Sequence, residues 1–171
     1  MKTRRSGGVR AATDTIKSHN IEEHRHDPYK ARGKQADPCV CRHCMAVYLK
    51  GRWTWSDEPL PSAHWDICPA CQRIEDKYPA GELTLSGTFM KRHGDEIVRL
   101  ARNTEALERA EHPLQRIMAV ERADDRIVIT TTDIHLPRRI GHAIARAYHG
   151  TLDTHYDEAG HFVRMAWSRN D

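Results

Sequence analysis

Apolar residues recur with a helical period in two stretches of the C-terminal half of this 171-residue chain. The first stretch covers residues 88–112 and is ended by Pro113. Its apolar positions are Ile97, Leu100, Ala101 and Leu107. The second begins near Pro137, which suits a first helical turn, and stops at Gly150. Its stripe consists of Ile140, Ala143, Ile144 and Ala147. Two amphipathic helices are therefore expected.

Strand-like segments alternate with these helices. They cover residues 116–122, 126–132, 151–156 and 161–167. The resulting order of helix, hairpin, helix and hairpin predicts an α+β fold with two layers, over residues 88–171. We expect a four-stranded sheet with both helices packed on one face.

The preceding residues 38–87 have the pattern of a separate small module. Aromatic and β-branched residues at 46–55 predict a hairpin that turns at Lys50-Gly51. A short helix over 72–78 and a closing strand over 82–87 should follow. Residues 1–37 contain few apolar residues and are expected to form a basic, flexible arm.

Two CxxC pairs give this module its chemistry. They are Cys41 with Cys44, and Cys68 with Cys71. Four thiolates on two tight turns predict a zinc ion in a ribbon or treble-clef module, and the site would be structural because no position remains for water. A disulfide pair or a redox CxxC is the alternative. Cys39 is either a substitute ligand or a free thiol beside the site.

Composition limits the remaining possibilities. Hydrophobic residues make up 39% of the chain, which allows a modest core that a bound metal would supplement. No stretch is apolar enough to cross a membrane, and the basic beginning of the chain lacks the apolar segment of an export signal. We therefore expect a cytoplasmic protein that does not bind membranes.

Sequence motifs of common enzyme classes are absent. The chain has no GxxxxGK[ST], GxGxxG, HExxH or GxSxG pattern, and no HxE precedes its CxxC pairs. We expect neither catalysis nor a small-molecule substrate.

Charge and aromatic residues favour RNA as a partner. Residues 1–36 hold nine Lys and Arg against four Asp and Glu, and such basic arms often lie along phosphates. Between the CxxC pairs, Arg52, Trp53 and Trp55 would contact RNA, since two exposed tryptophans on one strand face would stack bases. The alternatives are a solvated arm, and tryptophans that pack the core of the module or dock it on the second domain.

The second predicted helix carries a basic face opposite its apolar stripe. Arg138, Arg139, His142 and Arg146 lie on or near this face. Arginine side chains there would make bidentate contacts to phosphates. An ordinary solvated helix face is the alternative interpretation.

Several longer motifs carry a resemblance to a known family. They are HDPYK at 26–30, AVY-x2-GRW-x-W at 46–55, CPACQRI at 68–74, LSGTF at 85–89, HPLQRIM at 112–118 and ITTTDIHLPRRIGHAIARAYHG at 129–150. With the first CxxC pair, they resemble a bacterial family of short zinc-motif proteins. That family is similar to the zinc-binding N-terminal part of the large-ribosomal-subunit nuclear export adaptor, which has four CxxC knuckles where this chain has two.

The resemblance implies a zinc protein that binds ribosomes or ribosomal RNA. It further implies a role in protecting or hibernating ribosomes under stress or low oxygen. A zinc-based protein–protein adaptor is the alternative function.

Overall fold

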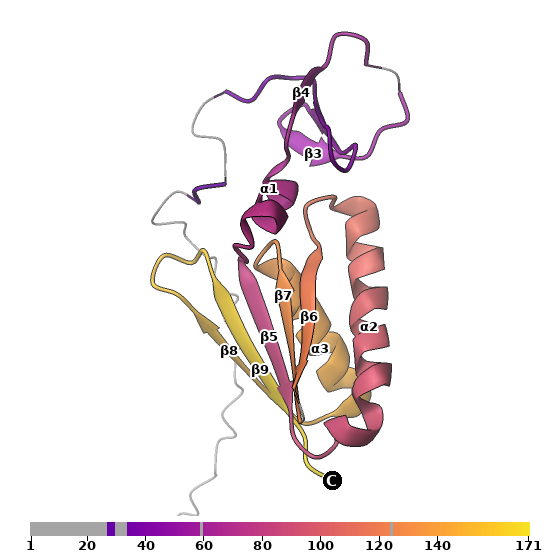
Figure 1. The fold of residues 1–171 in the computed structure, drawn as a ribbon, viewed down its shortest axis with the longest axis vertical. Helices are drawn as coiled ribbons and strands as arrows, with labels where there is room; N and C mark the ends of the chain where they lie inside the picture. Colours follow the sequence, from indigo (N-terminus) through magenta and orange to yellow (C-terminus); the bar gives the residue numbers. More distant parts are fainter. Residues whose placement is uncertain (1–26, 30–33, 59, 124) are drawn as a thin grey trace, which may run out of the picture.

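The computed structural model describes residues 27–29, 34–58, 60–123 and 125–171. They form a small four-stranded cap beside a larger five-stranded sheet, with helix α1 between the two parts (Figure 1). The chain is thus α+β, as predicted. Most of the expected basic arm, residues 1–26 and 30–33, lies outside the described residues.

The cap contains four short strands in the order β3-β2-β1-β4. They are β1 (Cys39–Cys41), β2 (Val47–Leu49), β3 (Arg52–Thr54) and β4 (His64–Asp66). β2 and β3 form the predicted hairpin, and Lys50 and Gly51 both have positive φ angles, 51° and 85°. Two successive positive φ angles match the right-handed twist of the flanking strands, which is why this turn suits a two-residue connection.

Helix α1 (Pro69–Asp76) begins three residues before the predicted start of the helix. The Cys68 thiol caps its first turn by accepting from the backbone N–H of Cys71 at 3.4 Å, and Pro69 follows directly. A proline is favourable there because the first helical N–H has no partner within the helix. Lys77 ends the helix in a left-handed conformation.

The larger sheet has the strand order β6-β7-β5-β9-β8. Its strands are β5 (Gly81–Ser86), β6 (Ile117–Ala123), β7 (Arg126–Thr131), β8 (Thr151–Tyr156) and β9 (Val163–Ser168). β5 lies at the centre, antiparallel to β7 and parallel to β9. The prediction that residues 82–87 close the cysteine module is therefore wrong, and the sheet has five strands instead of four. The reason is physical: the alternation of a single strand shows which side is buried but does not identify its partners.

Both long helices cover the same face of this sheet (Figure 1). They are α2 (Met90–Glu111) and α3 (His135–Tyr148), close to the predicted ranges. The core combines alternate strand residues such as Leu83 and Leu85 with Ile97 of α2 and Ile144 of α3, all fully buried. The two-layer arrangement is as predicted.

Leu107 departs from the prediction for α2. It was placed on the apolar face, yet its side chain is 75% exposed. The helical period extends to Leu107, but the α2 residues in the main core lie between Met90 and Ala101. Among the described residues, no helix has both the length and the apolar character needed to cross a membrane.

The central position of β5 predicts the effect of Leu83→Ala. Because Leu83 is fully buried in the main core, the substitution should lower the free energy of unfolding of the sheet by about 2–5 kcal/mol. Urea denaturation followed by circular dichroism measures this change. Glu82→Ala, on the opposite face of the same strand, should change it by less than about 1 kcal/mol. If Leu83→Ala lost bound metal but kept the stability of the larger sheet, β5 would belong to the cysteine module, and its assignment to the larger sheet would be contradicted.

Candidate metal centre and basic groove

Two tight turns hold the four cysteines. After β1 the chain reverses, with Cys41 N–H donating to Ala46 O at 2.8 Å and Met45 N–H donating to Cys41 O at 2.9 Å. The second pair lies at the start of α1, where Cys68 is the N-cap. Each turn therefore presents two sulfur atoms on one side of the backbone.

The structure brings all four predicted ligands together. The sulfur atoms of Cys41, Cys44, Cys68 and Cys71 lie within 4.8 Å of one another, and Cys44 Sγ is 3.7 Å from Cys68 Sγ. A tetrahedral ion with metal–sulfur bonds of about 2.3 Å requires sulfur–sulfur edges of about 3.8 Å. The residues present therefore fit a tetrahedral metal ion.

Backbone N–H groups also point at the sulfurs. Cys68 N–H donates to Cys41 Sγ at 3.3 Å, besides the bond within α1 from Cys71 N–H to Cys68 Sγ. These donors stabilise the thiolate form that metal binding requires.

A buried arginine completes this site. Arg116 is only 6% exposed, and it directly precedes β6 in the larger sheet. Its guanidinium donates to Cys44 Sγ at 2.9 Å and to Cys71 Sγ at 3.3 Å, and its Nε–H donates to Pro113 O at 2.7 Å. Four thiolates and a divalent ion carry a net charge of −2, and the guanidinium halves this buried charge.

Arg116 is a functional residue that the sequence does not reveal. It stands at the start of a predicted strand, and no local pattern sets it apart from other arginines. Only its approach to cysteines 45 and 72 residues away shows its role.

The thiols influence one another strongly. The bond from the Cys68 thiol, together with Arg116, lowers the pKa of Cys44 to about 4. The same bond and burial raise the pKa of Cys68, and burial raises the pKa of Cys71. The surroundings of Cys44 thus favour its thiolate form, and metal binding would displace protons from the buried thiols.

Cys39 is not part of this cluster. It is fully buried in β1, and burial raises the pKa of its thiol. Of the two interpretations left open by the sequence, the geometry favours a free buried thiol.

The tryptophans predicted to face RNA are half-buried against the cysteine cluster. Trp55 Nε1–H donates to Arg109 O in α2 at 2.7 Å, so this side chain joins the cap to the larger part. Trp53 packs within the cap, with its ring centre 5.6 Å from that of Tyr48. Both contacts match the alternative in which the tryptophans pack the module or dock it on the second domain. Arg52 is exposed at the start of β3.

The basic residues of α3 do lie together. Arg138, Arg139, His142 and Arg146 line one groove between α3 and α2. His112 and His135 extend this basic groove, and the exposed Leu107 borders it. One acidic side chain reduces the positive charge of the groove, because Glu108 Oε1 lies 3.5 Å from Arg139 Nε.

No protein-family model, curated protein or solved structure matches this chain. The family resemblance drawn from the motifs therefore stays a prediction, and the residues themselves carry the functional argument.

Removal of one ligand gives the first prediction for this centre. Cys68→Ser should abolish stable metal binding and unfold the cap, because a structural metal contributes directly to folding. Metal content and hydrogen exchange of residues 38–80 measure the effect. Cys39→Ser, which removes a buried thiol outside the cluster, should retain the metal. Full metal content in Cys68→Ser would contradict the assignment.

Arg116→Met gives the second prediction. Removal of a partner that bonds directly to metal ligands typically costs 10–100-fold in metal affinity, and a loss of about that size is expected here. Competition with a chromogenic chelator measures it. Arg122→Met serves as the control, because Arg122 is an exposed arginine of β6 that pairs with Asp95. Unchanged affinity in Arg116→Met would mean that the arginine only fills space.

Proposed function

We propose that this chain is a zinc-stabilised, non-enzymatic RNA-binding protein that acts on ribosomes. The observation that carries the proposal is the basic groove between α2 and α3. Its arginines are spaced along one side of a helix, and guanidinium groups bind phosphate oxygens in pairs. A phosphate backbone lying along α3 is the ligand that this arrangement suits best.

Zinc is the metal that we assign to the cysteine cluster. Four thiolates at tetrahedral separation suit zinc, and they leave no ligand position for substrate or water. The metal would therefore hold the cap together, and we place the cap among zinc ribbon or treble-clef modules. The folded cap contacts α2 through the hydrogen bond from Trp55 to Arg109. The metal would therefore also support one end of the basic groove.

Ribosomes are the partner that the family resemblance implies. The longest matching motif, residues 129–150, includes α3 and therefore the arginines of the groove. A cytoplasmic protein with this surface would bind exposed ribosomal RNA. Protection or hibernation of ribosomes during stress or low oxygen is the corresponding role.

A zinc-based protein–protein adaptor is the second candidate. The cap exposes two large apolar side chains, Trp65 at 59% and Met45 at 56%. Such residues are favourable in protein interfaces. Binding through them would depend little on salt, whereas binding through phosphates weakens steeply as salt rises.

Charge reversal in the groove tests the RNA proposal. The double variant Arg139→Glu/Arg146→Glu should weaken binding to ribosomal RNA and reduce the slope of log affinity against log salt by about 1–2. The same variant should dissociate from ribosomes at a lower salt concentration than the unmodified protein, as seen from its loss from the ribosome fractions of a sucrose gradient.

Arg126→Glu/Arg164→Glu provides a matched control. It makes the same change in net charge on the opposite face of the sheet, at two exposed positions. Its RNA affinity should stay close to that of the unmodified protein. Equal loss in both double variants would show that net charge, and not the groove, determines binding. Salt-resistant binding lost in Trp65→Ala would favour the protein adaptor.

A further inference from the structure

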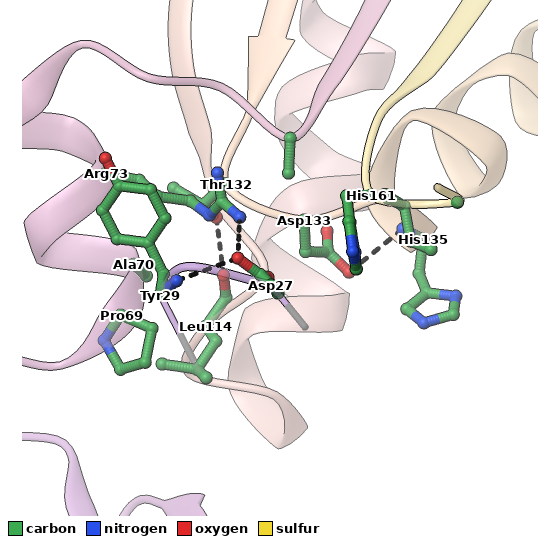
Figure 2. Close-up of a pocket in the computed structure, with 13 residues that line it drawn as sticks. Asp27, Tyr29, Pro69, Ala70, Arg73, Leu114, Thr132, Asp133, His135 and His161 are labelled. Atoms are coloured by element: carbon green, nitrogen blue, oxygen red, sulfur yellow. Dashed lines mark hydrogen bonds and ion pairs between the residues drawn. The ribbon is translucent and has the colours of Figure 1, made fainter. Parts of the chain in front are cut away.

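The junction between the cap and the larger sheet encloses a pocket of about 340 Å³ (Figure 2). This volume falls in the range of about 300–1,000 Å³ typical of small-ligand sites. Polar side chains lie on two opposite walls, with Arg73 and Tyr29 on one and Asp133 and His161 on the other (Figure 2). Asp27 lies between these walls, and Pro69 and Ala70 lie beside Tyr29 (Figure 2). Leu114 and Ile134 also contribute apolar groups to the lining.

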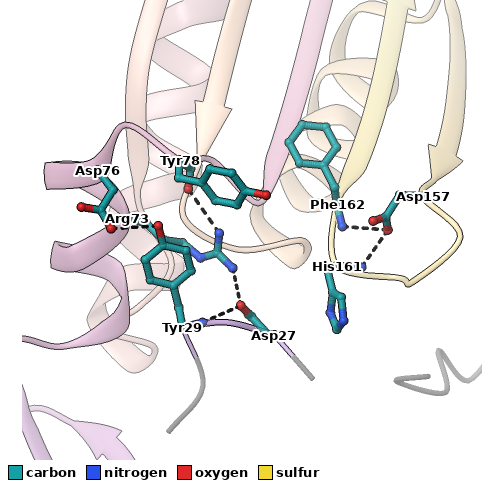
Figure 3. Close-up of polar contacts among 8 residues, drawn as sticks. All are labelled: Asp27, Tyr29, Arg73, Asp76, Tyr78, Asp157, His161 and Phe162. Atoms are coloured by element: carbon teal, nitrogen blue, oxygen red, sulfur yellow. Dashed lines mark hydrogen bonds and ion pairs between the residues drawn. The ribbon is translucent and has the colours of Figure 1, made fainter. Parts of the chain in front are cut away.

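The first wall is held by Arg73, which is only 3% exposed. Its guanidinium pairs with Asp27 Oδ1 at 2.7 Å, donates to Tyr78 O at 3.2 Å and stacks 4.2 Å from the centre of the Tyr29 ring (Figure 3). Tyr29 OH in turn donates to Asp76 Oδ2 at 2.9 Å. Because these contacts engage the guanidinium, this wall offers little positive charge to an anion.

The second wall offers hydrogen-bond capacity that the protein leaves open. The carboxylate of Asp133 accepts from the N–H groups of His135 and Leu136, at 3.1 and 3.0 Å, which occupies two of its roughly four acceptor positions. His161 Nε2 is buried and has no hydrogen-bond partner among the described residues. Buried polar atoms are nearly always bonded, so this nitrogen points to a ligand.

The loop that carries His161 is itself well fixed. Asp157 Oδ1 accepts from the N–H groups of His161 and Phe162, at 2.8 and 3.0 Å (Figure 3). The backbone of His161 is therefore held without any bond from Nε2. This nitrogen could bond to a ligand without loss of a hydrogen bond to the part of the chain that the structure describes.

These features select the chemical class of the ligand. Two carboxylates, Asp27 and Asp133, disfavour a phosphate group inside the pocket, and the combination of apolar and polar lining groups favours a flat ligand with apolar faces and polar edges. Burial raises the pKa of Asp133, so hydrogen-bond donors on the ligand would stabilise its charged form. Unstacked nucleobases are flat and are recognised through donors and acceptors on their Watson–Crick edges.

The pocket and the basic groove share a lining residue. His135, at the first position of α3, lines both. A strand whose phosphates follow the arginines of α3 would thus reach the pocket at the N-terminal end of the helix.

We propose that this pocket binds an unpaired guanine base of RNA. Guanine carries two donors side by side, N1–H and the N2 amino group, which the Asp133 carboxylate accepts together, while His161 Nε2 donates to guanine O6. The inference rests on the proposed RNA function, but its test does not require the groove.

The test uses the full-length, zinc-loaded protein and four nucleotides: GMP, inosine monophosphate, 7-deaza-GMP and AMP. All carry the same phosphate, so calorimetric differences between them report on the base. GMP and 7-deaza-GMP should bind alike. Inosine monophosphate, which lacks the N2 amino group, should bind about tenfold more weakly, as expected for one lost hydrogen bond to a charged acceptor, and AMP should bind at least as weakly.

His161→Leu provides the test from the protein side. It should bind GMP about tenfold more weakly, because one hydrogen bond is lost. His155→Leu, the same change at an exposed position of β8, should bind GMP as the unmodified protein does. Equal affinities for GMP and inosine monophosphate, absence of GMP binding, or unchanged binding in a folded His161→Leu protein would each overturn the proposal.

The two proposals fail in different ways. If the groove does not bind RNA, the Arg139→Glu/Arg146→Glu variant changes nothing in RNA binding, while GMP still discriminates against inosine monophosphate. If the pocket does not bind guanine, RNA binding still weakens as salt rises, but the four nucleotides show no difference in affinity.

Discussion

The contact between Arg116 and the cysteine sulfurs governs how the two parts of this protein fit together. The cap and the start of α1 supply four sulfur ligands, and the larger part supplies the buried cation, Arg116, that donates to three of them. A four-thiolate metal centre is expensive to bury without a compensating charge, and an unpaired guanidinium is equally expensive. Each part therefore needs the other, and the hydrogen bond from Trp55 to α2 provides a second attachment.

This attachment also shapes the pocket. One wall belongs to α1, which begins at a metal ligand, and the other wall belongs to the larger part. The cysteine cluster therefore lies directly next to one wall of the pocket, although no cysteine lines it.

Helix α3 serves three purposes with three sets of residues. Ile140 and Ile144 pack on the sheet, the arginines on the other side line the groove, and the N-terminal end borders the pocket. Gly141 allows the close packing, since a Cβ atom there would lie 3.1 Å from the Met165 side chain. The pocket and the groove meet at the N-terminal end of this helix, where His135 lines both.

Local patterns in the sequence determined a good part of this structure. The helices, both C-terminal hairpins, the Lys50-Gly51 turn and the four clustered cysteines follow from periodicity and spacing, because each depends on residues that are close along the chain. Only the tertiary structure decided that β5 is central and that Arg116 bonds to the cysteines. It also decided that Trp55 packs against α2 and that Asp133 and His161, far apart in the chain, share one wall of the pocket. A periodic pattern shows which side of an element is buried, but which distant partner covers that side depends on how all elements pack at once.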